Sequence, residues 1–471
     1  MTRRYMHHRA ELQMSPRRLP SKCLRARTVL LAAVVAAQVL HAGVHFTPDE
    51  YRSRRDALRA RIDTVGLAVL ASAETALRSG DVSYPYRQSS DLLYLAGITR
   101  PGTFLVVLGS PIDLGGRNVR DLLFIPPYSE MRARITGEAM TLQEATTVSG
   151  ADTVLENGGL GAFLAKILAV KRVLYHSAFQ PPFVVDWLNN RILFIERDAE
   201  KMLKEKFPGL AVKPVSPLVA SLRVVKSHNE VAAVEEAARV TCDGVMALLR
   251  AAHPGVFEYE LQAVLESTFR REGAQRTGFP SIIGSGPNST RVHYDANTRR
   301  TQKGDVIVVD IGAEVDGYTA DVTRTFPVDG HFTAAQRKLY TIVLEAQKAA
   351  IAAVKPGVHI RAVDKAGRDV IDRAGFKKYL THFLSHSVGL DVHDPGLTGM
   401  GAGDSLRAGM VITIEPGIYI PAGADDVDLS YWDTGIRIED DVLVTPDGCR
   451  VLTTGVPKEA EEIESLVGNS D

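Results

Sequence analysis

The sequence predicts an α+β protein of two domains. At 471 residues the chain is too long for one ordinary domain. Apolar runs of strand length mix with helical patterns in the first part, and helices accompany antiparallel strands in the second. Pro214 and Pro217 interrupt the periodicity between them, so we expect a smaller mixed α/β domain over 43–217 and a larger α+β domain over 218–471.

The composition is that of a soluble globular protein, with 45% hydrophobic residues, 24% charged residues and a net charge of −1. This charge gives no field that attracts nucleic acid. Three cysteines without a C-x-x-C spacing argue against a disulfide framework and against a cysteine zinc site. Any metal site must therefore use oxygen and imidazole ligands.

Residues 1–42 are predicted to be a signal peptide. Eight Lys or Arg residues and one Glu lie within residues 1–27, and the uncharged run Thr28–Leu40 follows. We expect cleavage near Ala42 and export to the periplasm or the medium of a bacterium, with no membrane attachment afterwards. Translation from Met14 is an alternative start. An uncleaved membrane anchor is a second alternative, because the uncharged run extends to Pro48.

In the first domain the pattern predicts a surface helix over 48–62, strands over 66–72, 102–109 and 120–127, and a helix over 161–170. In the second domain, capping boxes at Ser227 and Thr333 begin helices that stop before Pro254 and Pro356. A further helix covers 258–273, strands cover 409–420 and 435–445, and the tail 458–466 is expected to be a solvated acidic helix.

Residues 304–328 read as a buried β-hairpin whose turn is Asp316–Gly317. In this register Asp310 faces Thr323 and Asp321 faces Gly312. The two aspartates then share one face as diagonal neighbours, about 7–8 Å apart at the backbone. A carboxylate in so apolar a strand is costly unless it is paired or binds a metal, although an exposed hairpin is the simpler alternative.

Three further segments carry chemistry of the same kind. Glu415 ends an apolar strand, and strand alternation places Arg437 and Glu439 on one face. Residues 382–396 hold His382, His386 and His393 with two aspartates. Each group alone could be a strand-end charge or an ion pair. Four carboxylates and one histidine together make an oxygen-rich site with room for two divalent cations about 3.5–4 Å apart.

The order of these residues and their contexts, "VDIGAEVDGYTADVTRTF", "HFLSHSVGLDVHD", "ITIEPGIYI" and "GIRIEDDVLVT", resemble the pita-bread metallopeptidases, and aminopeptidase P in particular. "YPYRQSSDLLYLAGITRPGTFLVV" is similar to the N-terminal domain of that family. The resemblance covers about residues 46–456 and implies a C-terminal pita-bread domain. The metal ligands that it implies are Asp310, Asp321, His386, Glu415 and Glu439.

The resemblance also implies roles for other residues. His293, His382 and His393 match histidines that line the family's active site, and Arg437 matches an arginine beside the metals. Glu415 is the implied proton shuttle as well as a ligand. Asp394 is expected to fix the loop or to orient His393 and not to act in catalysis.

The implied activity is release of the N-terminal residue from peptides with proline second, with manganese as the usual metal and zinc or cobalt as alternatives. A homodimer or homotetramer is expected. Prolidase, which cleaves Xaa-Pro dipeptides, shares the ligand set and is the nearest alternative; a non-catalytic binding module is a more distant one. Two departures, Ile135 in place of a family tryptophan and the glycine-rich segment 398–404, leave the substrate length open.

Overall fold

The structure is a computed structural model that describes residues 46–469, except 138, 178–182, 187–190 and 398–403. The expected signal peptide over 1–42 lies outside these residues, as does most of the glycine-rich segment 398–404. Among the described residues, no helix combines the length and the apolar character needed to cross a bilayer.

The first domain is built on a six-stranded mixed sheet in the order β10-β7-β1-β4-β5-β6. Strand β1 pairs antiparallel with β4 and parallel with β7, and β5 pairs antiparallel with β4 and parallel with β6. The predicted apolar runs form its buried centre. Its strands are β1 (Gly66–Ala71), β4 (Phe104–Asp113), β5 (Asn118–Ile125), β6 (Thr153–Glu156), β7 (Val173–His176) and β10 (Ala211–Pro214). Two separate two-stranded sheets consist of β2 (Leu77–Ser79) with β3 (Val82–Ser83) and of β8 (Phe183–Asp186) with β9 (Arg191–Phe194).

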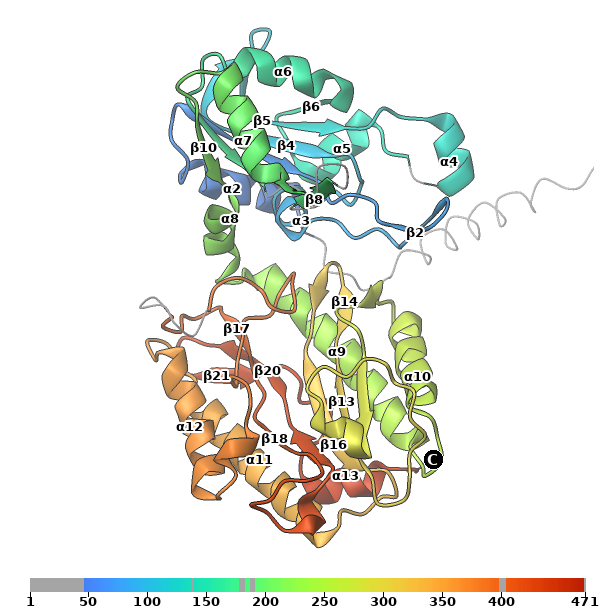
Figure 1. Cartoon of the computed structure of the whole chain (residues 1–471). Coiled ribbons are helices and arrows are strands. Elements are labelled where there is room, and N and C mark those ends of the chain that lie inside the picture. Colours follow the sequence, from blue (N-terminus) through green and yellow to red (C-terminus); the bar gives the residue numbers. More distant parts are fainter. Residues whose placement is uncertain (1–45, 138, 178–182, 187–190, 398–403, 470–471) are drawn as a thin grey trace, which may run out of the picture. The chain divides into compact units, whose positions relative to one another are not determined.

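Helices lie around this sheet, and α4 is set apart from it (Figure 1). They are α2 (Pro48–Arg59), α3 (Ser90–Ala96), α4 (Glu130–Thr136), α5 (Leu142–Ser149), α6 (Leu160–Ile167), α7 (Ile195–Lys206) and α8 (Ser216–Arg223), with the short 3-10 helix η1 (Asn157–Gly159).

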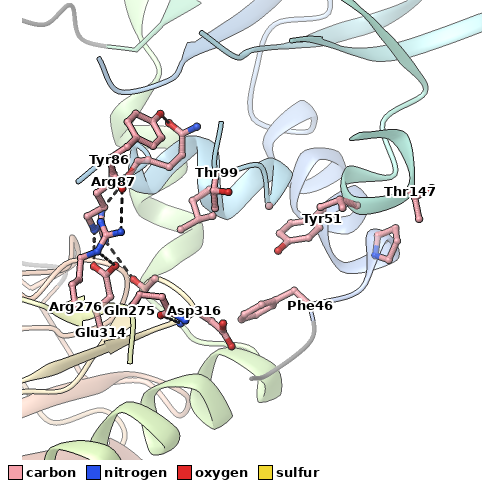
Figure 2. A pocket seen from close by; sticks show the side chains of 16 residues that line it. Phe46, Tyr51, Tyr86, Arg87, Thr99, Thr147, Gln275, Arg276, Glu314 and Asp316 are labelled. Atoms are coloured by element: carbon pink, nitrogen blue, oxygen red, sulfur yellow. Dashed lines mark hydrogen bonds and ion pairs between the residues drawn. The ribbon is translucent and has the colours of Figure 1, made fainter. Parts of the chain in front are cut away.

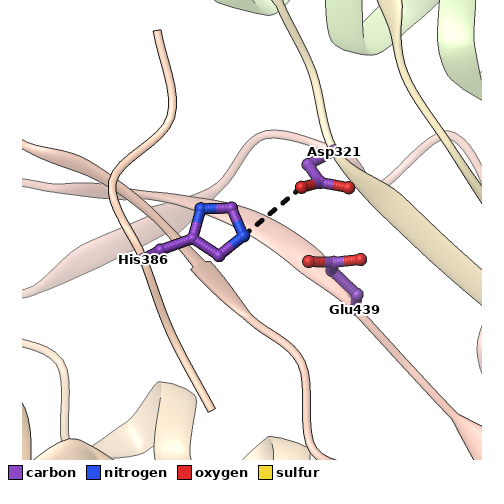
Figure 3. A group of neighbouring side chains, drawn as sticks. All are labelled: Asp321, His386 and Glu439. Atoms are coloured by element: carbon purple, nitrogen blue, oxygen red, sulfur yellow. Dashed lines mark ion pairs between the residues drawn. The ribbon is translucent and has the colours of Figure 1, made fainter. Parts of the chain in front are cut away.

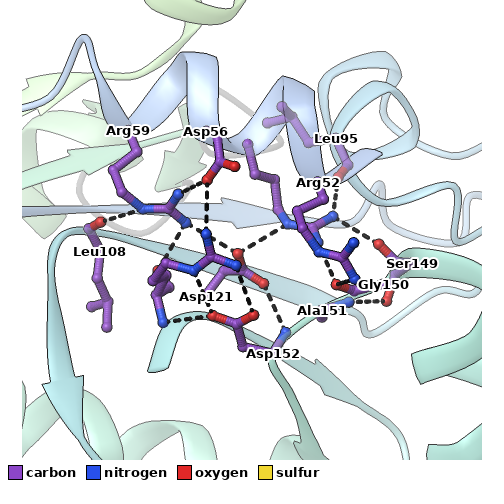
Figure 4. A network of polar contacts seen from close by, with 12 residues as sticks. Arg52, Asp56, Arg59, Leu95, Leu108, Asp121, Ser149, Gly150, Ala151 and Asp152 are labelled. Atoms are coloured by element: carbon purple, nitrogen blue, oxygen red, sulfur yellow. Dashed lines mark hydrogen bonds and ion pairs between the residues drawn. The ribbon is translucent and has the colours of Figure 1, made fainter. Parts of the chain in front are cut away.

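Helix α2 is present as predicted and exposes one face, but its buried face contains charged residues that the prediction did not place there. Arg55 is fully buried, and its guanidinium donates to Leu95 O and Ser149 O at 2.9 Å each. Its Nε lies 3.3 Å from Asp121 Oδ2, in a polar network that joins α2 to β5 and to the end of α5 (Figure 4). The sequence hides this burial because arginine is normally exposed.

The second domain places two helix pairs on either side of its strands, α9–α10 and α11–α12 (Figure 1). The helices are α9 (His228–Ala251), α10 (Glu258–Arg271), α11 (Ala334–Ala352), α12 (Ile360–Arg373) and α13 (Ala460–Leu466), with η2 (Gly286–Thr290), η3 (Lys377–Tyr379) and η4 (Leu429–Tyr431). The strands are β11 (Arg276–Thr277), β12 (Ile282–Ser285), β13 (Val306–Ile311), β14 (Ala313–Val315), β15 (Tyr318–Thr319), β16 (Val322–Pro327), β17 (Val411–Ile414), β18 (Gly417–Ile420), β19 (Thr434–Arg437), β20 (Asp440–Val444) and β21 (Cys449–Val451).

The capping boxes at Ser227 and Thr333 are present and begin α9 and α11, as predicted. Helix α12 was not predicted, although its buried side chains follow a helical period. The tail helix α13 exists, but it is not wholly solvated as expected, because Ile463 is buried in the core under α9.

The hairpin register is confirmed, since Asp310 pairs with Thr323 and Val315 pairs with Tyr318 across the Asp316–Gly317 turn. The strands themselves are less continuous than predicted. The hairpin divides between two three-stranded sheets, β12-β13-β16 and β11-β14-β15. Residues 409–420 and 435–445 also change sheets, so that β17 pairs with β20 whereas β18 pairs with β19. These changes of sheet fall next to the carboxylates that the sequence singled out.

Candidate active site

The four carboxylates lie at the places where strands end. Asp310 is the penultimate residue of β13, and Asp321 directly precedes β16. Glu415 follows β17, and Glu439 fills the gap between β19 and β20. Where a strand ends, a side chain no longer has to point to alternate faces of the sheet as it does within a continuous strand. This arrangement lets strands from separate sheets aim acidic groups at one point.

That point is a cavity of about 190 Å³. Its polar wall contains the five ligands implied by the family resemblance together with Arg437 and two further histidines, His293 and His393. Its apolar wall is made by Phe279, Pro280, Ile282, Val292 and Val392. A cavity with an apolar wall and a few convergent polar groups has the form of a small-ligand or peptide site.

A larger cavity of about 460 Å³ has different chemistry (Figure 2). Aromatic side chains line it, including Phe46, Tyr51 and Tyr86, and Arg87 there donates to Glu314 Oε2 at 2.6 Å. Glu314 is already paired there with Arg87 and Arg276, so the smaller, carboxylate-lined cavity is the candidate active site.

Asp321, His386 and Glu439 each offer one ligand atom, and these atoms lie within 4.8 Å of one another (Figure 3). His386 Nε2 lies 3.5 Å from Asp321 Oδ2 and 3.4 Å from Glu415 Oε1. The imidazole therefore stands between carboxylates of two different strands. A cation at this place would meet one nitrogen and several oxygen ligands.

The electrostatics of the cluster call for positive charge. Burial, followed by repulsion from Asp310, raises the pKa of Glu439 to about 8. Burial and repulsion from Glu439 also raise the pKa values of Asp321 and Glu415 well above their usual range. Within the described structure, Asp310 Oδ1 is buried without a hydrogen-bond partner. Carboxylates held this close fit divalent cations, which would ionise them and occupy the unpaired oxygen.

Arg437 is buried and supplies one positive charge, which cannot balance four carboxylates. Its Nη2 donates to Asp310 Oδ2 at 2.5 Å, its Nη1 to Tyr419 OH at 2.8 Å and its Nε to Thr323 Oγ1 at 3.0 Å. Burial acts against the charge, but Tyr419 and Asp310 raise the pKa of Arg437 well above its ordinary value. Arg437 thus stays charged and holds Asp310 in a fixed orientation.

The histidines of segment 382–396 take different places. His386 points into the carboxylate cluster, and the ring of His393 lies edge-on to it with a centroid distance of 4.2 Å. Burial, followed by the charge of His393, lowers the pKa of His386 to about 4, which keeps its nitrogen available as a ligand. Burial also lowers the pKa of His393, with a smaller effect from His293.

His382 does not line the cavity, in contrast to what the family resemblance implies. Its Nε2 lies 2.9 Å from Tyr419 OH, and its Nδ1 lies 3.7 Å from Glu415 Oε2. Burial, followed by Arg437, lowers its pKa to about 4. His382 therefore stands behind Glu415 and supports the site from outside. Asp394 also lies outside the cavity, where it is buried against Arg223 and Lys226.

His293 is exposed on an irregular segment that one buried carboxylate holds. Glu258, the first residue of α10, accepts hydrogen bonds from Ser285 N (2.8 Å), Tyr294 OH (2.8 Å) and Arg299 N (2.8 Å). These donors bracket His293 on both sides. A loop without regular secondary structure thereby gains a defined path past the cavity.

Sequence reasoning missed three groups that touch the site residues. Tyr419 joins Arg437 to His382, and Thr323 Oγ1 donates to Glu439 Oε2 at 2.7 Å. Asp441 Oδ2 accepts from the backbone N–H of Asp321 at 3.0 Å. The register had placed Thr323 opposite Asp310, which was a usable signal for that residue.

The described geometry agrees with comparisons to known proteins. Residues 232–446 match metallopeptidase family M24, and residues 51–175 match the aminopeptidase P N-terminal domain. The chain is 32% identical over 437 residues to Xaa-Pro aminopeptidase of Escherichia coli (strain K12), with 89% of this chain and 97% of that protein covered. The fold and site are those of a metal-dependent peptidase.

Solved structures give the same result. Pseudomonas aeruginosa aminopeptidase PepP superposes with a TM-score of 0.81 and 32% identity, over 90% of this chain and 98% of that one. Aminopeptidase P from E. coli with the inhibitor Pro-Leu gives a TM-score of 0.79 and 32% identity, with the same coverage. Xaa-Pro dipeptidase of Pyrococcus furiosus is 38% identical, but over 53% of this chain and 69% of that protein. The chain belongs to metallopeptidase family M24 and carries an aminopeptidase P N-terminal domain.

Proposed function

We propose that the protein is an Xaa-Pro aminopeptidase, which hydrolyses the peptide bond between the first residue and a proline in second place. The observation that carries this proposal is the convergence of four strand-end carboxylates and His386 on one cavity with an apolar wall. The relatives that match the chain over both of its domains support the choice of substrate, because they are named for this activity.

Asp310, Asp321, His386, Glu415 and Glu439 would hold two divalent cations. When bound, such cations polarise the scissile carbonyl and lower the pKa of water, so that a hydroxide nucleophile is available at neutral pH. Manganese suits a site with so many carboxylates, and zinc and cobalt are the alternatives.

The chain's own residues would then do three things. Glu415 would take a proton from the attacking water at a carboxylate oxygen and pass it to the leaving proline nitrogen. His393 would donate a hydrogen bond to the developing oxyanion. Arg437, fixed by Tyr419 and Thr323, would keep Asp310 oriented toward the metals.

The metal requirement is tested with Glu439→Ala, which should lose both turnover and bound metal when the protein is supplied with manganese. Elemental analysis of the parent chain should give two metal ions per chain. Thr445→Ala, at a half-buried residue outside the cavity whose hydroxyl donates to Asp447, is the control and should keep both. Full turnover by the Glu439→Ala chain would contradict this mechanism.

A second candidate, Xaa-Pro dipeptidase, is favoured by the 38% identity of the catalytic region to the P. furiosus enzyme. The match to that enzyme covers little more than half of the chain, whereas the aminopeptidase relatives match across both domains. Release of the first residue from an Xaa-Pro-Yaa tripeptide should exceed cleavage of the matching Xaa-Pro dipeptide. The reverse order would favour the dipeptidase.

We also propose that the protein is exported and assembles as a homodimer or homotetramer. The basic and then apolar sequence before Phe46 supports export. Helix α4 supports assembly, since it has no buried residue and leaves Met131 71% and Ile135 73% exposed. Light scattering of the purified protein measures the assembly, and a monomer at micromolar concentration would contradict it.

A further inference from the structure

Residues 387–394 form a loop that separates two active-site histidines. Its ends are closed by a hydrogen bond from Asp394 N to Ser387 O at 2.9 Å. His386 directly precedes Ser387, and His393 directly precedes Asp394. The path of this loop therefore sets where both imidazoles stand and keeps their ring centroids 4.2 Å apart.

Two buried cations fix the carboxylate at the end of this loop. Arg223 Nη2 lies 2.5 Å from Asp394 Oδ1, and Lys226 Nζ lies 3.0 Å from Asp394 Oδ2. The side chains of Arg223, Lys226 and Asp394 are 5%, 1% and 1% exposed, respectively. Within the loop, Asp391 N donates to Asp394 Oδ1 at 3.1 Å, and Arg223 also binds Asp391 Oδ2 at 2.6 Å. The Asp394 carboxylate thus binds both cations and a backbone N–H group of the loop.

Arg223 is the last residue of α8, and Lys226 lies in the turn before α9. Both fall between residues 51–175 and residues 232–446, the two regions that match known families. A linking segment therefore supplies the cations that hold the loop.

Stability alone gives a weak reason for this cluster. Removing ions from water costs free energy that their mutual attraction often only balances, and apolar residues of similar size can replace such a pair at little cost. The surroundings are also tight, since a Cβ at Gly389 would lie 3.0 Å from Asp394 Oδ2 and 3.1 Å from Lys226 Cε. The ion pairs instead fix the orientation of the Asp394 carboxylate, because each of its oxygens has a defined donor.

We propose that Asp394, held by Arg223 and Lys226, is a positioning residue that sets the place of His393 beside His386 and the substrate. This inference rests on the peptidase activity and the role of His393 proposed above. Asp394 itself touches no reacting group. The cluster acts through the backbone of the loop, so its effect on turnover depends on the His393 imidazole being present.

The test is a double-mutant cycle in the full-length, manganese-loaded protein with an Xaa-Pro-Yaa tripeptide. Lys226→Met should lower kcat about ten- to a hundred-fold, as expected when a catalytic group moves by about 1 Å, with metal content unchanged. In a His393→Ala background the same change should lower kcat no further. A loss of equal size in both backgrounds, or no loss in either, would overturn the proposal.

A double variant that removes both charges distinguishes a positioning role from an effect on folding. Lys226→Met combined with Asp394→Asn leaves no unpaired charge between these two positions, so its thermal midpoint should exceed that of Lys226→Met while kcat stays low. If kcat recovers together with the midpoint, the cluster is merely structural. A crystal structure of the double variant gives a readout independent of activity, and an unchanged 4.2 Å separation of the His386 and His393 rings would also overturn the proposal.

Lys365→Met is the matched control, because Lys365 Nζ binds Asp369 at 2.5 Å in the same domain but is 71% exposed. It should leave kcat, metal content and the thermal midpoint unchanged. If the parent chain releases no residue from any Xaa-Pro peptide, the proposed function fails. If the parent is active and Lys226→Met equals it, only the positioning role fails.

Discussion

Arg324 offers a quantitative test of how much a buried ion pair stabilises the second domain where a strand ends beside Glu439. It is 1% exposed on β16, and its Nη2 lies 2.8 Å from Asp440 Oδ1. The guanidinium also donates to the backbone carbonyls of Thr323, Glu439, Val456 and Pro457. It therefore braces the strand end that presents Glu439 to the cavity.

Arg324→Met removes this charge while keeping much of the volume. Breaking a buried pair costs about 3–5 kcal/mol, because the remaining charge stays buried. Asp440 keeps a second cation, Lys458 Nζ at 2.5 Å, which favours the lower end of this range. The matched region 232–446 is about 215 residues long; at about 2.1 cal/mol/K per residue its unfolding entropy is about 0.45 kcal/mol/K, so the midpoint should fall by about 7–11 °C.

Scanning calorimetry of the catalytic-domain transition measures this shift. Arg239→Met is the control: Arg239 pairs with three acidic residues, but at 46% exposure. Exposed pairs of this kind contribute about 0.3–0.5 kcal/mol each, so the loss of all three should lower the midpoint of the control by about 2–3 °C. A loss at Arg324 no larger than the loss at Arg239 would refute the reasoning that burial, and not the number of ion pairs, sets the cost.

Three further predictions follow from the site and the fold. His393→Ala should lower kcat about a hundred- to a thousand-fold and keep its metal, whereas His386→Ala should lose metal as well; equal metal loss in elemental analysis would mean that the wrong histidine was assigned to the metal. Gly435→Ala should destabilise the protein by about 1–3 kcal/mol, because its Cβ would lie 1.8 Å from Ser289 O, whereas Gly448→Ala meets no atom within 4 Å and should be near neutral in urea unfolding. N-terminal sequencing of the exported protein should begin near Gly43, and an intact chain in the membrane fraction would favour an anchor instead.

The hairpin shows how much of the site a single sequence can predict. The Asp316–Gly317 turn fixed the register, and Asp310 faces Thr323 as expected. Turn chemistry is local, and a period of two carries that information along the strand. The register holds on both sides of Gly312, but the break in the strands there was not predicted: a Cβ at Gly312 would lie 1.8 Å from Ala320 O, and the chain passes from one sheet to another. Close backbone approach depends on tertiary packing, which the pattern does not contain.

The burial of charged residues in the first domain could also not be predicted from the sequence. Arg55 looks like any surface residue of an amphipathic helix, yet it is fully buried against Asp121 and the carbonyl groups at the end of α5. Its partners lie far along the chain, and only the folded sheet brings them to α2. Sequence periodicity reports which face is apolar, but it cannot report which polar residue will find a distant buried partner.

In the candidate site, too, some residues could be predicted from the sequence and others could not. Residues that carry the chemistry were recognisable, because a carboxylate such as Asp310 or Glu415 at the end of an apolar run conflicts with its surroundings. Of the residues that hold them, Asp394 was expected to fix its loop or to orient His393, whereas Glu258 was not recognised, because it occurs in an ordinary polar segment and becomes buried only when a loop folds over it. Both carboxylates accept hydrogen bonds from a histidine-bearing loop, Glu258 from Tyr294 OH beside His293 and Asp394 from Asp391 N in the loop that begins after His386. Loops without a regular hydrogen-bond ladder need such acceptors to keep one conformation. We therefore expect the positions of His293 and His393 to depend on these buried carboxylates as much as on the strands that carry the candidate metal ligands.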